Sequence, residues 1–254
     1  MKSTVYDESF WANHLECLVQ SARVVVPVVT ELVAPQSVVD VGCGVGAWLG
    51  AFAESGVKML KGFDGDYIDR RRLCFDASSF TAVDLRASIE IPGKYDLAVC
   101  LEVAEHLPAR QAGALVTALT KAAPVVLFSA ALPGQGGADH VNEQWPEYWR
   151  QLFEARGYQM LDPIRPRIRE DKRVAWWYRQ NLVLFVSKVW LESHPMLQPD
   201  TSGTDELNGD WIHAKLYRAA NSDLGVKELL NRLPSAIRRS LARRLKRSQP
   251  SQGL

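Results

Sequence analysis

Cysteine is scarce in this chain of 254 residues: its four cysteines stand far apart, and none forms a CxxC pair. In a chain of this size, such scattered cysteines are typical of reduced thiols in the cytosol. The N-terminal stretch MKSTVYDESFW lacks the apolar core of a signal peptide, and no apolar run approaches the length that spans a membrane. We therefore expect a soluble, cytoplasmic protein.

Net charge is also nearly absent, at +1, but it is distributed unevenly. Residues 225–247 hold eight Lys or Arg against one Glu, a local charge of +7, which leaves about −6 for the remainder. Leucine or isoleucine recurs every three or four residues across 226–247, which predicts an amphipathic helix. Such a helix could contact a membrane surface, a protein partner or nucleic acid. The alternative is a basic tail that is partly disordered or lies on the acidic body of its own chain.

Apolar runs alternate with amphipathic segments through most of the chain, which predicts a parallel sheet with helices on both faces. The expected strands lie in SVVDV, VKMLKGFDGD, FTAVDL, KYDLAVCLEV, APVVLFSAAL, YQMLDPI and NLVLFVSK. Helices are expected at 7–33, from Ala47 to about Gly56, at 108–122 and at 145–156, and Pro27 should break or kink the first. We divide the chain into an N-terminal helical segment (1–34), an α/β domain (35–190), a linker (191–209) and a helical basic tail (210–254).

Glycines cluster where the first strand must turn into a helix, in VVDVGCGVGAW. Gly42, Gly44 and Gly46 allow the backbone to approach a ligand closely and leave amides near the helix N-terminus. The spacing also matches a dinucleotide fingerprint loosely, so the loop alone does not choose the cofactor. Asp64 and Asp84 end the next two strands, where each could meet a ribose or an adenine, or could serve as a turn or N-cap residue.

The motifs VVDVGCGVGAW, GFDGD, AVDL and YDLAVCLEVAEHL, in that order, resemble those of class I S-adenosylmethionine-dependent methyltransferases over residues 36–187. The resemblance implies a Rossmann-like, doubly wound sheet of seven strands with the last strand antiparallel. It also implies that Asp64 holds the ribose and that Asp84 and Leu85 flank the adenine. The full set of cofactor-binding residues that we expect is Asp40, Gly42, Cys43, Gly44, Gly46, Asp64, Gly65, Asp84, Leu85, Leu101 and Glu102.

Two acids and a histidine follow the fourth strand: Glu102, Glu105 and His106 stand at i, i+3 and i+4, so one helical turn would point them the same way. They could be the polar start of a helix, or they could serve acceptor chemistry. With His140 from the next loop, they resemble the ligand set of small-RNA 3′-terminal 2′-O-methyltransferases. That resemblance implies a divalent cation (Mg, Mn or Zn) that binds adjacent hydroxyls and acidifies one. Without a metal, His140 is the first choice for general base, before Glu143 and His106.

Aromatic and basic side chains near the expected site leave further alternatives open. The aromatics could form a platform for a sugar or planar ring, or could be core: they are Trp145, Tyr148, Trp149, Trp176, Trp177 and Tyr178. Four arginines between the last two strands could bind an anionic substrate, although a solvated loop face is favoured: they are Arg165, Arg167, Arg169 and Arg173.

The sequence therefore predicts an S-adenosylmethionine-dependent O-methyltransferase that acts on a hydroxyl of a small molecule or glycan precursor, as in secondary-metabolite or surface-polysaccharide pathways. The alternatives are a 2′-O-methyltransferase of an RNA 3′ end and a non-catalytic cofactor-binding scaffold. No RNA-binding module accompanies the acidic body, which disfavours a nucleic-acid partner. An intact set of acceptor-side residues disfavours a scaffold.

Overall fold

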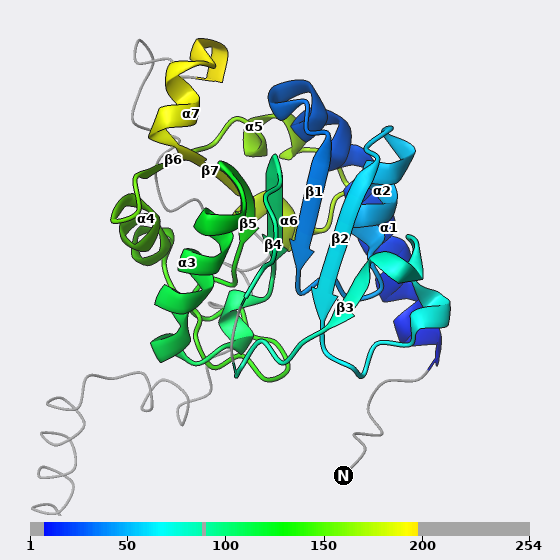
Figure 1. Ribbon diagram of the computed structural model, residues 1–254. Coiled ribbons are helices and arrows are strands. Elements are labelled where there is room, and N and C mark those ends of the chain that lie inside the picture. The colour runs from blue at the N-terminus through cyan, green and yellow to red at the C-terminus, as the bar shows by residue number, and fades with distance from the viewer. Residues whose placement is uncertain (1–7, 88–89, 198–254) are drawn as a thin grey trace, which may run out of the picture. The chain divides into compact units, whose positions relative to one another are not determined.

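Seven short strands form a single sheet in the computed structural model, which describes residues 8–87 and 90–197 (Figure 1). Their bounds are β1 (Ser37–Val41), β2 (Met59–Asp64), β3 (Phe80–Ala82), β4 (Leu97–Leu101), β5 (Val125–Ser129), β6 (Tyr158–Leu161) and β7 (Val183–Ser187). The order across the sheet is β3-β2-β1-β4-β5-β7-β6. Only β7 runs antiparallel to its neighbours, β5 and β6. The predicted doubly wound sheet with an antiparallel last strand is confirmed.

Helices lie on both faces of this sheet (Figure 1). They are α1 (Glu8–Val33), α2 (Ala47–Glu54), α3 (Ala112–Ala122), α4 (Pro146–Glu154), α5 (Arg165–Ile168), α6 (Trp176–Asn181) and α7 (Lys188–Glu192). Short 3-10 helices are η1 (Arg70–Arg72), η2 (Ala77–Ser79), η3 (Ala104–His106), η4 (Ala109–Gln111) and η5 (Pro195–Leu197). Helices α1, α2, α5 and α6 cover one face, and α3 and α4 cover the other.

The strands are buried on both faces because helices cover both faces and successive side chains point to opposite sides of the sheet. In β4, Leu97, Val99 and Leu101 pack with the α1 and α2 layer, whereas Ala98 and Cys100 pack with α3 and α4. This two-sided burial explains why the strands read as nearly continuous apolar runs rather than as alternating ones. Because β1, β2, β4 and β5 pair in parallel, their carboxyl ends lie at one edge of the sheet.

The predicted elements differ from the observed ones in a few places. Helix α1 runs without interruption through Pro27, so the predicted break is wrong. Buried Val25, Val26 and Val29 hold that part of the helix on the sheet, and tertiary packing outweighs one lost backbone hydrogen bond. Helices α5, α6 and α7 were not predicted. The predicted basic tail (210–254) and most of the predicted linker (191–209) lie outside the described residues.

All four cysteines are free thiols, as predicted. Within the described part of the chain, no helix combines the length and the apolar composition that a membrane span requires.

Candidate active site

The glycine loop follows β1 directly and hydrogen-bonds to the neighbouring strand. The backbone N–H groups of Gly42 and Cys43 donate to the Phe63 carbonyl in β2, at 2.7 and 3.1 Å. Gly42 has φ +81°, and a Cβ there would lie 2.3 Å from the Val103 side chain. Gly44 also has a positive φ, of +54°, but a Cβ there would meet no atom within 4 Å. The backbone at Gly44 therefore borders open space.

Asp64 lies at the end of β2, where the sequence placed it, and its carboxylate contacts the glycine loop. It accepts hydrogen bonds from the N–H groups of Gly44 (2.7 Å) and Gly65 (2.6 Å) and from the Tyr67 hydroxyl (2.5 Å). Tyr67 was not predicted, because the sequence gives no signal that distinguishes this exposed tyrosine from other surface residues. The carboxylate of Asp64 thus holds the glycine loop in place, beside which it was expected to bind the cofactor ribose.

Asp40, in β1, is a buried acid beside the same loop. Its Oδ2 atom is buried and has no hydrogen-bond partner. Burial raises the pKa of this carboxyl well above its usual value, and the nearby Asp64 raises it further. A buried carboxyl oxygen without a donor is costly unless a ligand supplies one, so Asp40 is a candidate for contact with a bound cation or N–H group.

The other predicted cofactor residues are distributed around this edge. Gly46 precedes α2 with φ +77°, and Leu85 packs in the α3 and α4 layer. Asp84 is exposed, and its Oδ1 accepts a hydrogen bond from the backbone N–H of Arg86 at 2.9 Å. Asp84 therefore does act as a turn aspartate, which was one of the two roles open to it.

A cavity of about 470 Å³ lies between the glycine loop, the end of β4, residues 135–140 and α6. The predicted site residues that line it are Asp40, Gly42, Cys43, Gly44, Leu101, Glu102, Glu105, His106 and His140. Gly46, Asp64, Gly65, Asp84, Leu85 and Glu143 do not line it. Most of the cofactor-side and acceptor-side predictions therefore meet in a single cavity.

Glu102 does not share a helical turn with Glu105 and His106, so that part of the prediction is wrong. Glu102 has φ +54°, in the left-handed region, and the 3-10 helix η3 begins only at Ala104. Its carboxylate accepts hydrogen bonds from the side-chain amides of Asn181 (3.1 Å) and Gln135 (3.0 Å). Burial raises the pKa of Glu102, and these amides offset part of that shift.

Glu105 is fully buried next to Glu102. Its Oε1 accepts a hydrogen bond from the Ala131 N–H at 3.2 Å, and its Oε2 has no hydrogen-bond partner. Burial, followed by the nearby charge of Glu102, raises the pKa of Glu105 to about 9. Two buried carboxyls this close favour holding one proton between them at neutral pH.

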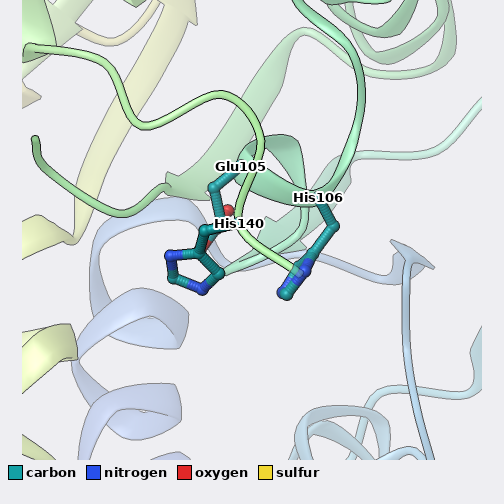
Figure 2. A group of neighbouring side chains, drawn as sticks. All are labelled: Glu105, His106 and His140. Carbon is teal, nitrogen blue, oxygen red and sulfur yellow. The ribbon is translucent and has the colours of Figure 1, made fainter. Parts of the chain in front are cut away.

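Two histidines complete the acceptor side of the cavity. Figure 2 shows Glu105 and His106, from the turn after β4, gathered with His140 from the loop after β5. One ligand atom from each of the three residues lies within 4.8 Å of the other two. The two imidazole rings meet edge to face, with 4.9 Å between their centroids. Burial, with the neighbouring His140, lowers the pKa of His106, which keeps its ring neutral near pH 7.

This cluster contains three of the four predicted metal ligands. Glu102, the fourth, lies outside the group of three, and its oxygens accept from amides. Glu143, predicted as a general base, lies beside His140 instead: one of its oxygens is 2.9 Å from His140 Nδ1. Gln135 and Asn181 were missed, because single amides in a glycine-rich loop and a short helix carry no signature of their own.

The predicted aromatic platform divides into core and cavity residues. Trp176, Trp177 and Tyr178 line the cavity, and Tyr178 packs edge to face against Trp48 at 5.0 Å. Trp149 is buried against Phe128, so it belongs to the core. Trp145 is exposed, and Tyr148 is half-buried beside Trp149.

The four arginines do not form an anion site. Arg165 is buried in an ion pair with Asp162 at 2.8 Å, so a solvated position for it is wrong. Arg167 and Arg173 pair with Glu31 and Asp171 at the surface, and Arg169 is exposed, as favoured for a solvated face.

Comparison with known proteins is consistent with this geometry. A family model described as a methyltransferase domain matches residues 16–163. The chain belongs to this methyltransferase family. The strand order, with an antiparallel β7, is that of the class I S-adenosylmethionine-dependent methyltransferases. A search of curated protein sequences finds no match.

Two solved structures share the fold of this methyltransferase. CalS10, an amino pentose methyltransferase from Micromonospora echinaspora with bound S-adenosylmethionine, is 17% identical and has a TM-score of 0.53; the match covers 74% of this chain and 100% of CalS10. DesVI from Streptomyces venezuelae is 14% identical and has a TM-score of 0.52, with 71% and 96% covered. At these identities, the likeness establishes the fold alone.

Proposed function

We propose that this methyltransferase transfers a methyl group from S-adenosylmethionine to a hydroxyl of a neutral, polyhydroxylated small molecule such as a sugar ring. The observation that carries the proposal is the cluster of Glu105, His106 and His140, which faces the same cavity as the glycine loop. Transfer to a hydroxyl needs groups that take or weaken a proton, and this cluster is made of such groups.

The residues around the glycine loop fit S-adenosylmethionine. The cofactor supplies a methyl group on a positively charged sulfur. Asp40 offers a buried carboxyl oxygen without a donor, which suits the ammonium or another N–H group of the ligand. The open backbone at Gly44 allows close approach, and the buried acids that line the cavity favour a cationic ligand over an anionic one.

The transfer is an in-line displacement in which the acceptor O–C bond forms as the S–C bond of the sulfonium breaks. The products are the methyl ether and S-adenosylhomocysteine, and the hydroxyl proton passes to the cluster. His140 is suited to accept it because His140 lines the cavity and, once Nδ1 bonds to Glu143, has one ring nitrogen remaining.

The cluster also fits a divalent cation, which we include in the proposal. A carboxylate oxygen and two imidazole nitrogens suit Mn²⁺ or Zn²⁺, and Glu105 Oε2 is a buried oxygen without a partner. Glu105, His106 and His140 would hold the ion, in which case His140 would act as a ligand and not as the proton acceptor. Bound there, it would polarise the acceptor hydroxyl and lower the pKa of that hydroxyl.

The lining of the cavity supports a neutral acceptor. Among the described residues that line it, none is Lys or Arg, whereas Asp40, Glu102 and Glu105 are acids. A phosphate or carboxylate would find no cationic side chain to pair with among these lining residues. Trp176 and Trp177 add aromatic surface, on which the C–H face of a sugar ring can pack.

The test is an assay with S-adenosylmethionine labelled at the methyl carbon and a panel of acceptors. The panel pairs neutral sugars and catechols that carry adjacent hydroxyls with the corresponding sugar phosphates and amino sugars. The proposal expects labelled methyl ethers from neutral members, identified by mass spectrometry and NMR. Transfer only to nitrogen, to carboxylate or to phosphorylated members would contradict it.

A further inference from the structure

The Glu143 carboxylate contacts three groups of the loop that follows β5, here called the His140 loop (residues 134–143). The N–H of Gly134 donates to Oε2 at 2.7 Å, and the N–H of Gly136 donates to Oε1 at 2.8 Å. His140 Nδ1 lies 2.9 Å from the same Oε1. Glu143 therefore joins the start of the loop to the ring of His140 near the loop's end.

These contacts determine which nitrogen of His140 carries its proton. The two backbone N–H groups can only donate, so both oxygens of Glu143 act as acceptors, and a carboxylate has no proton of its own to donate. The Nδ1–Oε1 contact is then a hydrogen bond only if Nδ1 carries the proton. In the neutral ring, the lone pair is therefore on Nε2.

Gly137 leaves the space that the Nε2 side of the ring needs. A Cβ at position 137 would lie 2.2 Å from Nε2, well inside contact distance. Gly137 does not have a positive φ, so its backbone would accept alanine, and the restriction comes from the ring alone. Both Gly137 and His140 line the cavity, whereas Glu143 does not.

The loop is also attached to the turn that carries the other two cluster residues. The N–H groups of Val141 and Asn142 donate to the Glu105 carbonyl at 2.8 and 3.0 Å. The backbone next to His140 is thus held against η3, and Glu143 and Gly137 set the rotation of the ring about that anchor. A side chain so enclosed has few alternative orientations.

We propose that Glu143 and Gly137 are positioning residues that hold His140 in the Nδ1-protonated tautomer, with Nε2 presented to the acceptor or to a cation. This proposal rests on the proposed function, which gives His140 its role. Glu143, expected from the sequence as a candidate base, becomes the residue that orients the base. Metal-bound and proton-accepting histidines commonly depend on such a carboxylate partner.

Nitrogen NMR of the histidine rings tests the tautomer without any turnover. The full chain has five histidines, and a His140→Gln variant assigns the ring of interest. At a pH well above the ordinary histidine pKa of about 6.5, the wild type should show a protonated Nδ1 and an unprotonated Nε2 at His140. Glu143→Ala should shift the population toward protonated Nε2. An unchanged tautomer in a folded Glu143→Ala protein would overturn the proposal.

Kinetics with an accepted substrate provide the second test. Glu143→Ala should lower kcat by about 10- to 100-fold with little change in KM for S-adenosylmethionine, and Glu143→Gln, which keeps one acceptor oxygen, should recover part of the loss. Glu147→Ala, in an exposed pair with Arg150 on α4, is the matched control and should keep wild-type rates. Equal kcat in Glu143→Ala and the wild type would contradict a positioning role.

Gly137→Ala separates the orientation of the ring from the charge of Glu143. The added methyl should rotate the His140 ring and lower kcat, while thermal stability stays near that of the wild type. Gly113→Ala is the control, because a Cβ there meets only Arg156 Nη2, at 3.7 Å. Wild-type kcat in Gly137→Ala would overturn the role of Gly137. If the wild type methylates no hydroxyl, the proposed function fails, whereas the NMR result still decides the tautomer.

Discussion

The carboxylate of Asp64 accepts a hydrogen bond from the backbone N–H of Gly44 across 2.7 Å. This bond connects the end of β2 to the middle of the glycine loop after β1. The other oxygen of Asp64 accepts from Gly65 and from the Tyr67 hydroxyl. The residue expected to hold the cofactor ribose therefore also maintains the loop beside which the cofactor would bind.

Asp64→Ala should weaken binding of S-adenosylmethionine strongly, because it removes both a charged acceptor and the support of the glycine loop. Hydrogen bonds to charged groups contribute about 1.5–3 kcal/mol each, so we expect a loss of at least about 10-fold in affinity. Isothermal titration calorimetry measures it. Tyr67→Phe is the control: it removes only the hydroxyl on Asp64, so affinity should stay equal or rise. Unchanged affinity in Asp64→Ala would contradict the role of this residue.

Asp40→Asn should stabilise the ligand-free protein while it weakens cofactor binding. Burial raises the pKa of Asp40, so between the ordinary aspartate pKa of about 4 and the raised value the folded state binds more protons than the unfolded state. The free energy of unfolding of the wild type therefore falls as pH rises through that range, and the asparagine variant lacks this loss. Urea unfolding at several pH values should show that the free energy of unfolding of Asp40→Asn exceeds that of the wild type by about 1–3 kcal/mol, and that this difference grows with pH. A variant less stable than the wild type at pH 7 would contradict it.

Apolar runs and strand ends were readable from the sequence because burial on both faces leaves a strong local pattern. Asp64 could be placed beside the glycine loop and Glu105 in the cavity in this way, since parallel strands deliver their ends to one edge. The left-handed backbone of Glu102 could not be predicted from the sequence. Its backbone N–H donates to Ser129 and its carboxylate accepts from Gln135 and Asn181, and all three residues lie far away in the chain.

The same reason applies to Glu143. The sequence shows an acid three residues after His140, and this spacing is compatible with a base, a ligand or a surface residue. Its role depends on the N–H groups of Gly134 and Gly136, which approach only when the loop folds back. Hydrogen bonds that close a loop leave no periodic signal in the sequence.

Removal of divalent cations should abolish methyl transfer if the Glu105, His106 and His140 cluster holds a metal. Dialysis against EDTA should silence the enzyme, and added Mn²⁺ or Zn²⁺ should restore it. Mn²⁺ should also raise the Tm of the wild type, because a ligand of the folded state stabilises it. Full activity in EDTA would assign the chemistry to base catalysis alone.

Glu105→Gln should remove the stabilising effect of Mn²⁺ without destabilising the metal-free protein. The pKa of Glu105 is raised to about 9, so its carboxyl is largely neutral at pH 7, and a neutral amide of the same shape replaces it at little cost. Glu54→Gln, in an exposed pair with Arg23, is the control and should keep the response to Mn²⁺. An undiminished shift in Tm in Glu105→Gln would show that the ion binds elsewhere.

Trp176→Ala should raise the KM for a sugar acceptor by about 2- to 10-fold, since an aromatic contact contributes about 0.5–1.5 kcal/mol. Trp176 lines the cavity on α6, and it is only partly buried, so its loss should cost little stability. Steady-state kinetics should show an unchanged KM for S-adenosylmethionine, and Trp176→Phe should recover part of the acceptor KM. Trp190→Ala, on α7 and stacked on His194 away from the cavity lining, is the control. If Trp176→Ala and Trp190→Ala give the same acceptor KM, Trp176 does not bind the acceptor. The preference for a neutral ring then rests on the absence of Lys and Arg among the described lining residues.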